Sequence, residues 1–154
     1  MLFERGIAAV EIITVPAEPA ALEMVNAFIQ EKLKAVDCSK QTRMQLHLAV
    51  EEIFVNISSY AYHPGMGQVE VGVDIDGEPP TVTIRFLDQG RPFNPLNQPD
   101  VDISLSALER EIGGLGILLV KKTMDQINYA YENGKNILTI KKGIESSKDG
   151  ESSI

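Results

Sequence analysis

Hydrophobic and polar positions along the chain predict helices in its first half and strands on either side of them. Apolar residues at helical spacing predict an amphipathic helix over residues 20–36, and a second helix that starts at Ser39 as N-cap and runs to about Tyr62. Shorter runs rich in β-branched residues, some of them strictly alternating, predict strands. The expected strands cover residues 7–15, 69–75, 81–87, 127–131 and 136–141.

Turn residues define how these segments are connected. Asp76-Gly77 and Asn133-Gly134 each separate two predicted strands, as in hairpins. Residues 89–112 have no strong period and contain three prolines, and such a long loop in a compact domain is often functional. A short helix is expected over residues 113–125. The order of elements predicts an α+β two-layer sandwich, in which helices cover one face of a mixed, largely antiparallel sheet.

Composition narrows the class of protein. The 154 residues suffice for a single domain over residues 1–142, and the Ser-, Lys- and acid-rich tail 143–154 is predicted to be disordered. A net charge of -8 argues against non-specific binding to nucleic acid or to acidic membranes. The single Cys38 excludes an internal disulfide, and neither a signal peptide nor a membrane span is evident. We therefore expect a cytoplasmic domain that contacts neither nucleic acid nor membrane.

Glu52 and Asn56 form the first candidate site. They lie four residues apart on the second predicted helix, hence on one face and within about 6 Å of each other. A carboxylate can accept a proton from an attacking hydroxyl, and an Asn oxygen suits Mg²⁺. Glu51 is the neighbouring alternative but points to another face. The pair could equally be an ordinary solvated Glu and a helix-surface Asn.

Asp88 and Gly90 form the second candidate site, directly after the strand 81–87. A carboxylate at a strand end can accept a hydrogen bond from an exocyclic amine such as that of adenine. Gly90 would let the backbone approach a flat ring closely. An ordinary turn is the alternative reading of Asp-x-Gly.

The third candidate site is the glycine cluster Gly113-Gly114-Leu115-Gly116 at the start of the last predicted helix. Glycines there permit tight turns and expose N–H groups to phosphate oxygens. The pattern is neither a Walker A loop nor a dinucleotide fingerprint. Arg110, just before the cluster, could reach phosphate charge or could be a plain surface arginine.

Taken together, these motifs resemble the N, G1 and G2 boxes of the GHKL superfamily of ATP-binding domains. The blocks AVEEIFVNISSYAY, FLDQGRPFNP, GGLGILLVKKTMD and NGKNILTIKK are similar to the small bacterial anti-sigma factor serine/threonine kinases in particular. The resemblance covers about residues 7–142. It implies the GHKL (Bergerat-like) ATP-binding fold, with ATP and Mg²⁺ as cofactors.

The resemblance also implies roles for individual residues. Glu52 would be the general base and Asn56 the Mg²⁺ ligand, while Asp88 would hold adenine and Gly90 would line its pocket. The glycine cluster would let the preceding loop close as a lid over the triphosphate, with Arg110 as a lid arginine at a longer offset than expected.

The implied function is that of a kinase that phosphorylates a Ser or Thr of an antagonist protein, binds a sigma factor and forms a homodimer. The alternative is an ATP-responsive binding module of the same fold without phosphoryl transfer. A histidine kinase would need an upstream helical hairpin with a phosphoacceptor His, and a gyrase- or MutL-type ATPase would need a transducer domain. We expect neither within these 154 residues.

Overall fold

A computed structural model of the chain describes residues 11–97 and 114–144. Its strands are β1 (Glu11–Pro16), β2 (Gln68–Asp76), β3 (Thr81–Asp88), β4 (Gln126–Glu132) and β5 (Lys135–Gly143). Its α-helices are α1 (Leu22–Leu33), α2 (Lys40–Tyr60) and α3 (Gly114–Thr123), and short 3-10 turns cover Pro19–Ala21 and Pro95–Asn97. None of the helices in this part of the chain is both long enough and apolar enough to cross a membrane.

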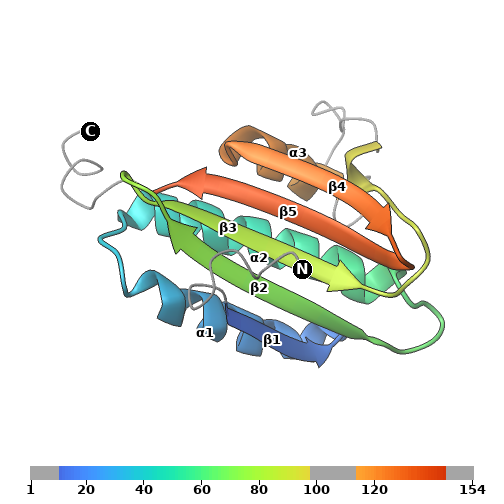
Figure 1. Cartoon of the computed structure of the whole chain (residues 1–154). Coiled ribbons are helices and arrows are strands. Elements are labelled where there is room, and N and C mark those ends of the chain that lie inside the picture. Colours follow the sequence, from blue (N-terminus) through green and yellow to red (C-terminus); the bar gives the residue numbers. More distant parts are fainter. Residues whose placement is uncertain (1–10, 98–113, 145–154) are drawn as a thin grey trace.

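The five strands form one antiparallel sheet in the order β1-β2-β3-β5-β4. All three helices lie on the same face of this sheet (Figure 1). The predicted α+β two-layer sandwich is therefore confirmed, with a sheet that is antiparallel throughout its described strands.

Helix α2 follows the sequence prediction closely. Ser39 is its N-cap, because its hydroxyl accepts a hydrogen bond from the Thr42 backbone N–H at 3.1 Å. The helix ends at Tyr60, two residues before the predicted end. One side of it is buried in the core at the helical spacing of i, i+3, i+4, i+7 and i+8. Those buried side chains are Leu46, Ala49, Val50, Ile53 and Phe54.

The strands supply the other half of the core through their alternating inward positions. On β2, β3 and β5 the inward aliphatic and aromatic side chains are almost completely buried against the helices. The inward rows consist of Val69, Val71 and Val73, of Val82, Ile84 and Phe86, and of Leu138 and Ile140.

The last hairpin also confirms its prediction. Asn133 and Gly134 both have positive φ, 53° and 77°, as the tight turn between β4 and β5 requires. Strand β5 continues to Gly143, and Ile144 is 6% exposed, so the first two residues of the predicted tail belong to the packed domain. The rest of that tail, the start of the first predicted strand and most of the predicted long loop lie outside the described residues.

Replacing Ser39 by Ala should lower the free energy of unfolding by about 1 kcal/mol, because the first turn of α2 loses its capping acceptor. Urea denaturation followed by circular dichroism measures this difference. The matched control is Ser59→Ala, at an exposed position of the same helix. Equal stability of the two variants would contradict the assigned role of the cap.

Candidate nucleotide site

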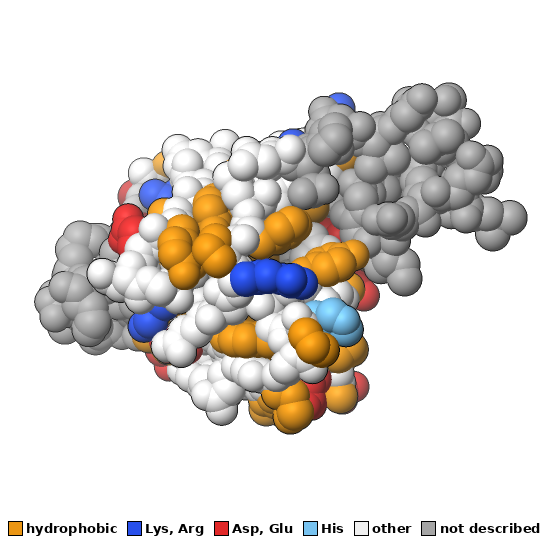
Figure 2. Space-filling model, turned by 90° about the vertical axis from the view of Figure 1, so that its right-hand side faces the viewer, with side chains coloured by type: hydrophobic (Ala, Val, Ile, Leu, Met, Phe, Trp, Pro, Cys, Tyr) orange, Lys and Arg blue, Asp and Glu red, His pale blue; other side chains and the backbone are white. Residues whose placement is uncertain are grey.

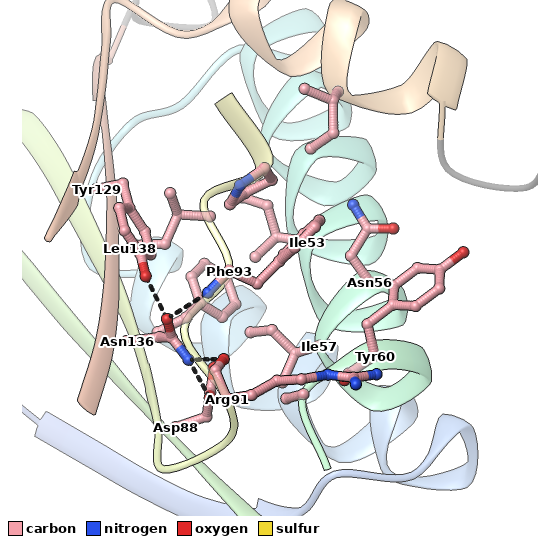
Figure 3. A pocket seen from close by; sticks show the side chains of 14 residues that line it. Ile53, Asn56, Ile57, Tyr60, Asp88, Arg91, Phe93, Tyr129, Asn136 and Leu138 are labelled. Carbon is pink, nitrogen blue, oxygen red and sulfur yellow. Dashed lines mark hydrogen bonds between the residues drawn. The ribbon is translucent and has the colours of Figure 1, made fainter. Parts of the chain in front are cut away.

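A pocket opens between α2, the ends of β3 and β5, and the first turns of α3. It contains about 450 Å³ of space free of protein atoms, part of which is open to solvent. Its wall is mostly apolar, with Asn56, Asp88, Arg91 and Asn136 as polar exceptions (Figure 3). The apolar and aromatic lining consists of Ile53, Ile57, Tyr60, Ala61, Phe86, Phe93, Pro95, Ile117, Tyr129 and Leu138.

Asp88 lies at the inner end of this pocket. It occupies the inward position on β3 after Phe86 and is only 6% exposed. Its Oδ1 accepts hydrogen bonds from the Gly90 N–H and from the Asn136 side-chain amide, each at 2.9 Å. Burial raises the pKa of Asp88, and those two hydrogen bonds oppose that rise. Within the described part of the chain no hydrogen bond engages Oδ2, so this oxygen is available to a ligand amine.

Gly90 has a packing role that the sequence analysis did not predict. A Cβ at this position would lie 2.2 Å from the Ala61 carbonyl oxygen, at the end of α2. The neighbouring Arg91 N–H donates to that same oxygen at 3.0 Å. The glycine therefore allows the chain after β3 to pack against the backbone that follows α2. This contact forms one edge of the pocket, and the contact of Gly90 with a flat ring stays a prediction.

Glu52 and Asn56 both face the region between α2 and α3. Asn56 lines the pocket beside Ile53 (Figure 3), whereas Glu52 is not among the lining residues and packs against Gly116 of α3. A Cβ on Gly116 would lie 1.9 Å from the Glu52 Cδ, so a larger residue at 116 would displace this carboxyl. Glu52 Oε2 is buried without a hydrogen-bond partner in the described chain. Burial, and then the nearby Glu51, raise the pKa of Glu52.

Glu51 points elsewhere, as its helical position predicts. Its Oε1 lies 3.8 Å from His47 Nε2, one turn earlier on the outer side of α2. Both side chains are about 40% exposed or more. Of the two adjacent acidic residues, Glu52 is thus the one that packs against α3.

The structure brings together part of each predicted motif. Gly114, Leu115 and Gly116 lie in α3, with Gly116 against Glu52, and the following Ile117 lines the pocket. Arg110 and Gly113 lie outside the described residues, so their predicted phosphate contacts and the lid stay predictions. Asn56 alone does not form a metal cage, and no cluster of three or more His, Cys, Asp or Glu residues suited to a metal occurs in the described segments. Mg²⁺ generally takes few protein oxygens and completes its shell with phosphate and water, so Asn56 would be one ligand among several.

Asn136 is the site residue that the sequence prediction missed. It is 6% exposed and stands directly opposite Asp88 in the β3–β5 register. The missed signal is the alternation of β5, in which Asn136 precedes Leu138 and Ile140 on the inward face. A polar residue at the first inward position of a strand predicts a buried hydrogen-bond network.

Two exposed aromatic side chains, Tyr60 and Phe93, line one edge of the pocket. The rings of Tyr60 and Phe93 lie 6.1 Å apart, and Arg91 Nε donates to the Tyr60 carbonyl at 3.2 Å. Both aromatic residues are exposed, as are Met66 and Tyr131 at the same end of the sheet. Figure 2 views the molecule from this end and shows hydrophobic side chains gathered around a basic one. Such a rim can pack against a planar ring or its ribose.

A family model described as "Histidine kinase-like ATPase domain" matches residues 15–142. The chain belongs to this family. The matched segment runs from the end of β1 to the end of β5, so it includes every described element of the pocket. Membership supports an ATP-binding, kinase-type function, and domains of this GHKL type generally bind ATP with Mg²⁺.

The chain is also similar to solved structures of histidine kinases. One is the histidine kinase domain from the Erythrobacter litoralis EL346 blue-light activated histidine kinase, at 15% identity and a TM-score of 0.47. The match covers 88% of this chain and 64% of that domain. Another is the Acinetobacter baumannii histidine kinase AdeS, at 13% identity and a TM-score of 0.42, covering 88% and 70% respectively. No curated protein matches the chain.

Replacing Glu52 by Gln should stabilise the nucleotide-free protein at neutral pH. A carboxyl whose folded pKa is raised stabilises the fold fully below its unfolded pKa, near the ordinary value of 4.5, and this contribution is lost as the pH rises through the folded pKa. Glu52→Gln removes that loss. Its melting temperature should therefore exceed that of the wild type at pH 7 to 8, and the difference should shrink towards pH 4.

Differential scanning fluorimetry across this pH range measures the effect. Glu51→Gln is the matched control and should show a smaller change, because Glu51 is half exposed. A Glu52→Gln variant that melts below wild type at pH 7 would contradict the buried, unpaired carboxyl.

Proposed function

We propose that the domain is an ATP-dependent protein serine/threonine kinase that acts as an anti-sigma regulatory factor. The observation that carries the nucleotide part is the arrangement of Asp88 and Asn56 at two separate places in one apolar pocket. Asp88 Oδ2 would accept the adenine amine, while Asn56 would face the phosphates. The resemblance of the sequence blocks to anti-sigma kinases supports the serine/threonine and sigma-factor part, including a homodimeric state.

The chain's own residues suit phosphoryl transfer. Oε2 of Glu52 is buried on the side of α2 that faces α3, and the raised pKa of this carboxyl favours accepting a proton from a substrate hydroxyl. Asn56 would be the protein ligand of Mg²⁺, which when bound neutralises phosphate charge. Glu52 and Asn56 come from one rigid helix, so their spacing does not depend on a loop.

The proposed reaction needs only ATP and a hydroxyl of the antagonist protein. The hydroxyl oxygen of a Ser or Thr in the antagonist forms a bond to the γ-phosphorus of ATP as the bond to the β–γ bridging oxygen breaks. Glu52 takes the hydroxyl proton, and ADP leaves with the bridging oxygen. Positioning and charge stabilisation account for most of catalysis in such transfers.

Adenine recognition can be tested first by ligand-induced stabilisation. ATP with Mg²⁺ should raise the melting temperature of the wild type, because a ligand that binds only the folded state stabilises it. Asp88→Asn should retain the acceptor for Gly90 and Asn136 but present a donor to the adenine amine. The shift with ATP should therefore fall more than the shift with GTP. An unchanged melting curve of the wild type at millimolar ATP would refute the nucleotide site.

Transfer itself is tested with labelled ATP and candidate antagonist proteins from the same genome. Glu52→Gln should lower the transfer rate by roughly 10²-fold or more while ATP affinity persists. Asn56→Ala should also weaken the Mg²⁺ dependence of ATP binding, because it removes a ligand oxygen. Glu51→Gln is the control and should transfer at the wild-type rate.

One result would contradict the kinase, and another would contradict only the assignment of its base. If the wild type binds ATP but phosphorylates no partner, the domain is an ATP-responsive binding module. If Glu52→Gln transfers at the full rate and Glu51→Gln does not, the base is Glu51.

A further inference from the structure

The Asn136 side chain makes a larger set of hydrogen bonds than any other in the pocket. Its Nδ2 donates to Asp88 Oδ1 and to the Arg91 carbonyl, both at 2.9 Å, and more weakly to the Gly90 carbonyl at 3.4 Å. Its Oδ1 accepts from the Phe93 N–H at 3.1 Å and from the Tyr129 hydroxyl. Figure 3 shows these contacts converging on a single side chain.

These partners all belong to the nucleotide site or support it. Asp88, Gly90, Arg91 and Phe93 form the segment that leaves β3 and borders the pocket, and Tyr129 comes from the neighbouring strand β4. Asn136 itself is on β5, whose register with β3 is fixed by a complete antiparallel ladder. A rigid strand therefore holds a segment that has no ladder of its own beyond Asp88.

The chemistry of this position is specific to an asparagine. Its amide carries two N–H donors and one carbonyl acceptor at the end of a short side chain. It can therefore bind oxygen acceptors through Nδ2 and hydrogen-bond donors through Oδ1 at the same time. Aspartate would lack the donors and would place a second carboxylate against Asp88. Serine or threonine could donate only one hydrogen bond at a time, and alanine none. Each loss would leave buried polar groups of the segment without partners.

We propose that Asn136 is the positioning residue of the adenine site, and that it sets both the rotamer of Asp88 and the path of residues 88–93. This inference rests on the proposed nucleotide function. Asn136 occupies Asp88 Oδ1, so that Oδ2 is the oxygen left for the base. An amine is attracted to that oxygen, whereas the carbonyl oxygen of guanine at the same place is repelled. Asn136 thereby contributes to the choice of base without contacting it.

The positioning role is tested first without any nucleotide. Asn136→Ala should increase hydrogen exchange of the Gly90 and Phe93 amides by roughly tenfold or more. Without the hydrogen bonds of Asn136, local opening of this segment costs less free energy. Exchange in the middle of β3 and β5 should stay near that of the wild type. Asn128→Ala, at an exposed position on β4, is the matched control and should change neither amide. Unchanged exchange at Gly90 and Phe93 in Asn136→Ala would overturn the proposal.

Nucleotide affinity then tests the consequence. Titration with ATP and with GTP should show about a tenfold or larger loss of ATP affinity in Asn136→Ala and a smaller ATP-to-GTP ratio. Asn136→Ser, which keeps one hydroxyl donor, should lie between Ala and the wild type, and this variant carries the test if Ala does not fold. ATP affinity and base preference within twofold of wild type in the folded variants would overturn the inference.

The two claims fail in different ways. A wild type that binds no ATP refutes the proposed function and with it any role of Asn136 in base choice, whatever the exchange data show. A wild type that binds ATP with clear preference, together with Asn136 variants that lose segment protection and keep that preference, refutes the Asn136 inference alone.

Discussion

The burial of one side of α2 against the sheet is the constraint on which the rest of this structure depends. Leu46, Val50, Phe54 and their neighbours are almost completely removed from water, and such burial contributes about 25 cal/mol per Å² of apolar surface. Because that side must face the sheet, the flank carrying Glu52 and Asn56 must face α3 and the pocket. The orientation of these two site residues therefore follows from how the core packs. Turning the helix to move either residue would expose the core.

A second constraint comes from the pairing of β3 with β5. This register places two buried polar side chains, Asp88 and Asn136, opposite each other at the point where the ladder ends. A buried carboxylate is costly unless it is hydrogen-bonded, and Asn136 and the Gly90 N–H provide those bonds. The same bonds engage only Oδ1, and no hydrogen bond from the described residues reaches Oδ2. An apolar pocket with one well-oriented acceptor is suited to a flat base with an amine.

Much of the fold could be predicted from sequence because its signals are local. Ser39 caps α2 through a residue three positions away, and Asn133-Gly134 closes a hairpin between adjacent strands. Asp88 could also be predicted, since it continues the inward alternation of β3. Asn136 was not identified, because its partner Asp88 lies 48 residues earlier in the chain. The two side chains meet only when β5 pairs with β3, and α3 and β4 separate these strands in the sequence. The reason for Gly90 was likewise hidden, because it depends on where the end of α2 packs. For Arg110 and Gly113 the predictions stand as sequence inferences.

The central claim is that adenine binds at Asp88, with the phosphates directed along α2 towards Asn56 and the glycines of α3. A crystal structure of the chain with Mg²⁺ and a non-hydrolysable ATP analogue tests it most directly. We predict the adenine amine within hydrogen-bond distance of Asp88 Oδ2, with Asn136 still bound to Oδ1 and Asn56 on the phosphate side. A nucleotide bound elsewhere on the domain, or a base whose amine is turned away from Asp88, would contradict the account.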